Sequence, residues 1–174
     1  MNNKILIIYK SSTGFTEKYA KLIASKTGCK LATYKSATPG LIARYDTVVF
    51  GSRAHAGMID GYKKIKKITS KNPYVKLILF VTGATPASSK DIIEAFWKQN
   101  LSPEEILKIP HFYMPGGLCY ERMSMPDKLM MKMAALMIKN KKNKTPFETG
   151  FENAIKASYD ISSPEYIKPL VSIL

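Results

Sequence analysis

The chain has 174 residues, 45% of them hydrophobic and 10% aromatic, which is typical of an ordered globular domain and excludes a fibrous or low-complexity protein. Its formal net charge is +14, yet only three of its 27 basic residues are arginine, the residue that reads guanine edges, so a sequence-specific nucleic-acid partner is disfavoured. Two cysteines, Cys29 and Cys119, are too few for a disulfide framework and favour a cytoplasmic protein.

Apolar segments with strand character alternate along the chain with segments of helical spacing. Strands are predicted over residues 4–9, 29–34, 46–52, 75–83 and 111–117, the second of them an edge strand. Helices are predicted over residues 14–27, 58–70, 89–99, 126–139 and 148–159. This alternation predicts an α/β fold, a doubly wound parallel sheet between two layers of helices. The whole chain is expected to form one domain, with residues 159–174 as a C-terminal tail.

No segment has the length of a signal peptide core or of a membrane span. The opening apolar run has five residues, and the longest other run, LMMKMAALMI over residues 129–138, stops at ten and contains a lysine. The expected location is therefore the cytoplasm, either free or peripheral on the inner face of the cell membrane.

A junction rich in hydroxyl groups joins the first strand to the first helix. It reads SSTGFT, residues 11–16, and the helix that follows points its free N–H groups and positive dipole end at the carboxyl edge of the sheet. The junction lacks the Gly-Lys-Ser/Thr of a triphosphate loop and the G-x-G-x-x-G of a dinucleotide site. It therefore predicts a phosphomonoester site made of hydroxyls and amides, with simple helix capping as the alternative.

The segment YKSSTGFT, residues 9–16, resembles the phosphate loop of the flavodoxin family. The resemblance implies FMN as cofactor, a five-stranded sheet of order 2-1-3-4-5, and two loops at the flavin ring, residues 51–59 and 82–89. Around the phosphate it implies the side chains of Ser11, Thr13 and Thr16 and the amides of Ser12, Gly14 and Phe15. At the ring it implies Ser52, Arg53, Ala54, Thr82, Gly83 and Ala84.

Two side chains of the first ring loop are candidates for catalysis. Arg53 could face the flavin pyrimidine edge or a substrate carboxylate, and His55 could relay protons near neutral pH. The alternative for each is an exposed loop side chain. The sequence indicates no metal site.

The segment PGGLCYERMSMPDKLMMKMAALMI, residues 115–138, resembles the region after the fifth strand in bacterial menaquinone-dependent protoporphyrinogen oxidases, which are flavodoxin-like. This resemblance adds Gly116, Gly117 and Tyr120 to the expected flavin site. It also implies a quinone or another small molecule as redox partner.

The helix over residues 126–138 is apolar around most of its girth. Two alternatives follow: it packs in the core, or it lies at an interface where the lysines of residues 139–144 face anionic lipid. The expected function is an FMN-dependent oxidoreductase. An electron carrier of flavodoxin type and a membrane-associated FMN-binding domain without turnover are the alternatives, and the positive charge argues against a carrier that docks on basic partners.

Overall fold

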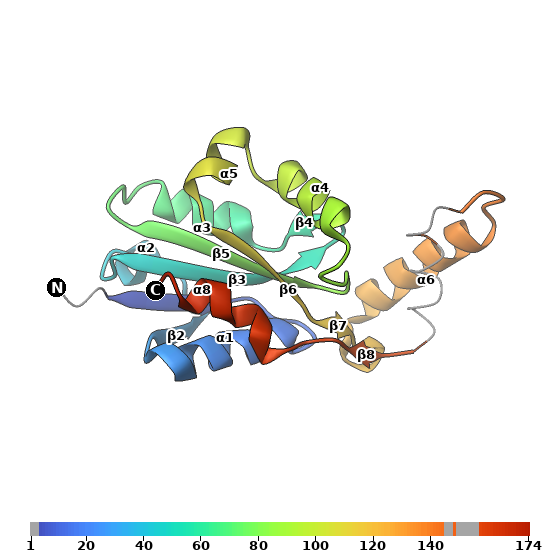
Figure 1. The fold of residues 1–174 in the computed structure, drawn as a ribbon, viewed down its shortest axis with the longest axis horizontal. Coiled ribbons are helices and arrows are strands. Elements are labelled where there is room, and N and C mark those ends of the chain that lie inside the picture. Colours follow the sequence, from blue (N-terminus) through green and yellow to red (C-terminus); the bar gives the residue numbers. More distant parts are fainter. Residues whose placement is uncertain (1–3, 145–147, 149–156) are drawn as a thin grey trace.

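A parallel sheet forms the centre of the computed structural model, which describes residues 4–144, 148 and 157–174. Its five parallel strands lie in the order β2-β1-β3-β5-β6, with helices on both faces (Figure 1). When only these five parallel strands are counted along the chain, their order in the sheet is 2-1-3-4-5, so the predicted fold is confirmed. They are β1 (Ile5–Tyr9), β2 (Lys30–Thr33), β3 (Thr47–His55), β5 (Lys76–Gly83) and β6 (His111–Pro115).

The central strands are buried on both faces, which is why their sequences are continuously apolar. Leu6 and Ile8 of β1 pack on one face, and Ile7, between them, packs on the other. The first face is covered by α2 (Pro39–Ile42), α3 (Tyr62–Thr69), α4 (Lys90–Asn100) and α5 (Pro103–Lys108). The second is covered by α1 (Phe15–Thr27), the 3-10 turn η3 (Pro164–Ile167) and α8 (Lys168–Val171).

The segment expected to be an open loop over residues 51–59 is a hairpin, so that prediction is wrong. Strand β3 continues to His55 and pairs antiparallel with β4 (Met58–Ile59). Ala56 and Gly57, with φ of 48° and 76°, form the left-handed turn that suits a tight hairpin. The predicted helix over 58–70 consequently begins at residue 62, as α3.

Helix α5 was not predicted, although its start carries a clear signal. Ser102 accepts a hydrogen bond from the N–H of Glu105 (3.2 Å), and the Glu105 carboxylate accepts one from the N–H of Ser102 (3.0 Å). This reciprocal capping box, with Pro103 at the first helical position, starts the helix. The helix itself is too short to show a periodic apolar pattern.

The C-terminal segment packs against the sheet. The predicted helix over 148–159 lies mostly outside the described residues, but its end is wrong, because Tyr159 belongs to β8 (Tyr159–Asp160), which pairs antiparallel with β7 (Gly117–Leu118). Farther on, Ile167 and Leu170 are buried with α1 on the second face of the sheet. The expected tail therefore supplies part of the hydrophobic core.

Helix α6 (Met125–Lys139) projects away from the sheet at the edge where the parallel strands end (Figure 1). Its predicted span is confirmed, but packing in the core is wrong, because Asp127 is the one buried residue among its fifteen. Large apolar side chains are exposed along it: Met125, Leu129, Met130, Met133, Leu136 and Met137. Among the helices that the structure describes, none is long and apolar enough to cross a membrane.

Candidate functional site at the carboxyl edge of the sheet

The loop over residues 11–16 leads from β1 into α1 at the carboxyl edge of the sheet. Gly14 has a φ of +102°, a left-handed conformation that favours glycine, and its N–H donates to Ser11 Oγ (3.2 Å). Among the residues that the structure describes, no side chain caps the N-terminus of α1. Within the described ranges, the hydroxyls of Ser12 and Thr13 make no hydrogen bond, so they remain available to a ligand.

Three of the predicted loops meet through buried hydroxyl groups. The hydroxyls of Thr16 and Thr82 lie 2.7 Å apart, and the Thr82 hydroxyl also donates to the carbonyl of Ser52 (3.4 Å). The Ser52 hydroxyl in turn donates to the carbonyl of Asp60. Thr16 and Ser52 are therefore buried ties between loops, rather than side chains pointing into an open site.

The segment after β6 closes the same edge. The N–H of Gly116 donates to the carbonyl of Gly83 (2.8 Å), and the Tyr159 hydroxyl donates to the carbonyl of Ala84 (3.1 Å). A Cβ at Gly116 would lie 2.9 Å from the Cβ of Phe15, so this backbone directly abuts the phosphate loop. The structure thus brings the predicted residues of four separate segments to one edge.

Gly117 and Tyr120 lie beyond this contact. Gly117 is in β7 with a φ of +137°, and a Cβ there would lie 2.1 Å from the carbonyl oxygen of Tyr159. Tyr120 donates its N–H to Ser158 Oγ (2.9 Å), and the ammonium of Lys128 lies 5.4 Å from the centre of its ring. Gly117 and Tyr120 therefore hold the segment after β6 against Ser158 and Tyr159.

Arg53 is paired with carboxylates of its own chain. Its Nη1 lies 2.8 Å from Asp127 in the first turn of α6, and its Nε lies 3.3 Å from Asp60. Lys10 pairs with the other oxygen of Asp60 at 2.6 Å, and His55 Nδ1 lies 3.8 Å from Asp127. The candidate catalytic residues Arg53 and His55 are therefore together, in an ion-pair cluster that joins β3 to α6.

The cluster keeps both of its carboxyl groups ionised. Burial raises the pKa of Asp127. The hydrogen bond and charge of Arg53, together with the charge of His55, lower this pKa by a larger amount, so the net shift is downward. Burial likewise raises the pKa of Asp60, and Lys10 and Arg53 more than offset that effect. Ala54, next to Arg53, faces away from this cluster into the apolar packing on the first face of the sheet.

The sequence analysis did not identify Asp60, Asp127 or Arg122 as residues of this edge. Of these three residues, Asp127 could have been found from the sequence, since it is the single acidic residue in a helix otherwise made of apolar and basic residues. Arg122 had no such signal. A Cβ built on Gly14 would lie 3.1 Å from Arg122 Nη1, so this guanidinium lies beside the phosphate loop.

The donors of this edge fit the phosphate end of FMN. A phosphomonoester needs several N–H and O–H donors around a compact group, and a helix N-terminus supplies partial positive charge. Here the loop offers the N-terminus of α1, the hydroxyls of Ser12 and Thr13 and a glycine that permits close backbone approach. The Arg122 guanidinium lies beside that glycine.

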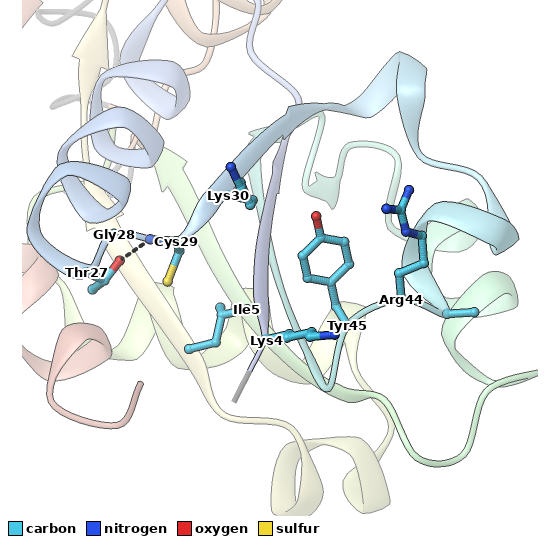
Figure 2. Close-up of a pocket in the computed structure, with 9 residues that line it drawn as sticks. Lys4, Ile5, Thr27, Gly28, Cys29, Lys30, Arg44 and Tyr45 are labelled. Carbon is cyan, nitrogen blue, oxygen red and sulfur yellow. Dashed lines mark hydrogen bonds between the residues drawn. The ribbon is translucent and has the colours of Figure 1, made fainter. Parts of the chain in front are cut away.

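A surface depression lies at the opposite edge of the sheet, where the strands begin (Figure 2). Its volume is about 750 Å³, and Lys4, Cys29, Lys30 and Arg44 are among its lining residues. None of the predicted flavin-site residues lines it. Arg44 is therefore an arginine far from the phosphate loop.

Comparison with known proteins identifies the family. A sequence model described as "Flavodoxin domain" matches residues 6–145. No curated protein matches the sequence. Among solved structures, a WrbA-like flavodoxin from Agrobacterium tumefaciens is 17% identical, with a TM-score of 0.44 over 72% of this chain and 88% of that one.

Two further solved structures resemble this chain to a similar degree. A flavodoxin from the domain Archaea is 11% identical, with a TM-score of 0.42 over 88% of this chain and 99% of that one. Flavodoxin 2 from Bacillus cereus is 21% identical, with a TM-score of 0.40 over 63% and 84%. Because the family model extends over most of the sheet and includes the phosphate loop, the chain belongs to the flavodoxin domain family.

Proposed function

We propose that this protein binds FMN at the carboxyl edge of its sheet and uses it as an oxidoreductase. The observation that carries the proposal is the loop over residues 11–16, which lies inside the matched family model and has an uncapped helix end with free hydroxyls. The flavin supplies the electron chemistry, and the protein supplies its binding and surroundings.

The residues of the edge have separate roles in this proposal. Ser12, Thr13 and the first amides of α1 hold the phosphate. Gly83, Ala84 and Gly116 belong to the same edge, beside the proposed position of the flavin ring. Arg53 and His55 lie at the border of the site, where about a third of the His55 side chain is exposed.

The proposal is tested by the visible spectrum and by reoxidation. Purified protein, or protein mixed with FMN, is expected to show the visible absorption bands of a bound flavin. After reduction, rapid reoxidation by a soluble quinone would support a quinone-coupled enzyme, and rapid reoxidation by a one-electron protein acceptor alone would support a carrier. A protein that takes up no FMN would refute the proposal.

The exposed face of α6 favours attachment of this redox protein to an anionic membrane surface. Leu129, Met133, Leu136 and Met137 are 61%, 58%, 60% and 76% exposed, and their spacing places them on one side of the helix. Lys132 and Lys139 border that side, and exposed Lys142 follows the helix. An apolar face bordered by lysines suits the boundary between acyl chains and anionic headgroups.

This location would give a flavin at the base of α6 access to a quinone in the lipid. The resemblance of residues 115–138 to protoporphyrinogen oxidases suggests a porphyrinogen as electron donor, and we include it among the donors to be tested. A membrane-attached protein that binds FMN but turns over no donor and acceptor pair would instead be the domain without catalysis.

Vesicle sedimentation tests the membrane proposal. We expect the protein to sediment with vesicles of phosphatidylcholine and phosphatidylglycerol, less so at high salt, and hardly at all with phosphatidylcholine alone. Changing Leu129, Met133, Leu136 and Met137 to serine should abolish sedimentation. The matched control is Leu107→Ser on α5, where the side chain is 87% exposed.

Two outcomes would contradict membrane attachment. One is wild-type protein that stays in the supernatant with anionic vesicles at low salt. The other is a dimer, detected by analytical ultracentrifugation, that the four serine substitutions abolish while vesicle binding is unchanged. That second outcome would identify another copy of the chain as the occupant of this face.

A further inference from the structure

The two lysines that flank the phosphate loop in sequence are already paired. Lys10 Nζ lies 2.6 Å from Asp60 Oδ1. Lys18 Nζ lies 3.0 Å from Asp160 Oδ2 and donates to Ser162 Oγ at 2.7 Å. Neither ammonium group is therefore a free counter-charge for an anion in the loop.

Arg122 is in a different situation. A Cβ built on Gly14 would lie 3.1 Å from its Nη1, so the guanidinium lies close to the residue that immediately precedes α1. In the part of the chain that the structure describes, the guanidinium has no hydrogen bond or ion pair, and the residue is exposed. It is thus a permanent positive charge beside an uncapped helix end, with its donors unused.

The backbone that carries Arg122 is held at several points. The residue ends the 3-10 turn η2 (Tyr120–Arg122), where its N–H donates to the carbonyl of Cys119 (3.2 Å). The start of this turn is tied to Ser158 by the N–H of Tyr120. Upstream, pairing of β7 with β8 anchors the segment to the C-terminal part of the chain. Binding an anion would therefore require ordering of the arginine side chain but not of its backbone.

We propose that Arg122 binds the phosphate of FMN in the loop over residues 11–16 and makes this protein select FMN over riboflavin. The proposal rests on the proposed function. An FMN phosphate carries nearly two negative charges at neutral pH, whereas the loop itself offers only neutral hydroxyls and amides. A guanidinium can donate two parallel hydrogen bonds to phosphate oxygens, and riboflavin presents no group that could accept them in this way.

Flavin fluorescence titration tests the proposal without any catalytic assay. The probes are FMN and riboflavin, each titrated with wild-type protein, Arg122→Gln, Arg122→Lys and the control Arg44→Gln. Arg122→Gln is expected to weaken FMN binding by about 10- to 100-fold and to leave riboflavin binding within about twofold, because the lost interaction is a charge-assisted hydrogen bond to phosphate.

The other variants sharpen this expectation. Arg122→Lys should keep part of the preference for FMN, since it retains the charge but loses the paired donors. Arg44 lies at the opposite edge of the sheet, so Arg44→Gln should bind both flavins as the wild type does. Added salt should weaken FMN binding more in the wild type than in Arg122→Gln.

The outcomes separate this proposal from the one on which it rests. If wild type binds FMN and Arg122→Gln retains the same ratio of FMN to riboflavin affinity, the role of Arg122 is refuted and the FMN-binding function stands. An equal loss of both flavins would also refute it, because it would indicate a structural role. If wild type binds neither flavin, the proposed function fails and the role of Arg122 fails with it.

Discussion

Thr13→Leu should weaken FMN binding by about 100-fold or more while leaving the fold intact. Thr13 lies between β1 and α1, and its hydroxyl makes no hydrogen bond within the described residues. Removing a donor to a charged phosphate costs about 10- to 100-fold in affinity, and the leucine side chain would also occupy space next to Gly14.

Fluorescence titration gives the affinity, and thermal unfolding followed by circular dichroism verifies the fold. Thr33→Leu is the matched control, since Thr33 is exposed on the edge strand β2 and lies outside the predicted flavin site. If Thr13→Leu bound FMN as tightly as the wild type does, the assignment of the phosphate to this loop would be wrong.

The second large effect is expected from Arg53→Met, which should lower the free energy of unfolding by about 2 to 4 kcal/mol at pH 7. Arg53 pairs with both Asp60 and Asp127, and the carboxyl group of Asp127 is almost fully buried. Without the guanidinium, Asp127 would lose its closest ion-pair partner and would keep the more distant His55. Urea unfolding, with the change in midpoint at constant slope, measures the loss.

The loss should depend on pH in a defined direction. In the wild type the pKa values of Asp60 and Asp127 lie below their ordinary value near 3.8. Their ion pairs therefore stabilise the fold fully above about pH 4 to 5 and lose this effect as the pH falls through the lowered pKa values. The difference between wild type and Arg53→Met should consequently shrink in acid.

Two further variants test the cause. Combining Arg53→Met with Asp127→Leu should recover part of the stability, because the buried carboxylate without a close partner is then removed. Lys98→Met breaks an exposed pair with Glu94 on α4 and should leave the urea midpoint unchanged. If Arg53→Met unfolded at the wild-type midpoint, the cluster would not be a source of stability.

The fold could be predicted from the sequence because its cause is local. Strands such as β1 are apolar at every position, since Leu6 and Ile8 face one layer of helices and Ile7 faces the other. The phosphate loop could be predicted equally well, because its hydroxyl residues and its glycine are contiguous in the sequence. In both cases neighbouring residues carry the whole pattern.

The environment of individual side chains could not be predicted in the same way. The apolar pattern of α6 shows that one face avoids water, but it does not show what covers that face. In the structure Leu129 and Met137 are mostly exposed. Arg53 seemed available to a ligand because its partner Asp127 lies on a distant helix. Arg122 is brought beside Gly14 by tertiary contacts of its segment, among them the pairing of β7 with β8.

The packing of the C-terminal segment on α1 also bears on how the chain folds. Tyr19 accepts a hydrogen bond from the N–H of Ser163 across 144 positions of sequence, and Ile167 and Leu170 cover the same side of the sheet. Such contacts form only after the chain has lost the entropy of closing a very long loop. The face with α1 is therefore expected to be sealed late in folding, after the face with α3 and α4, whose contacts are closer in sequence.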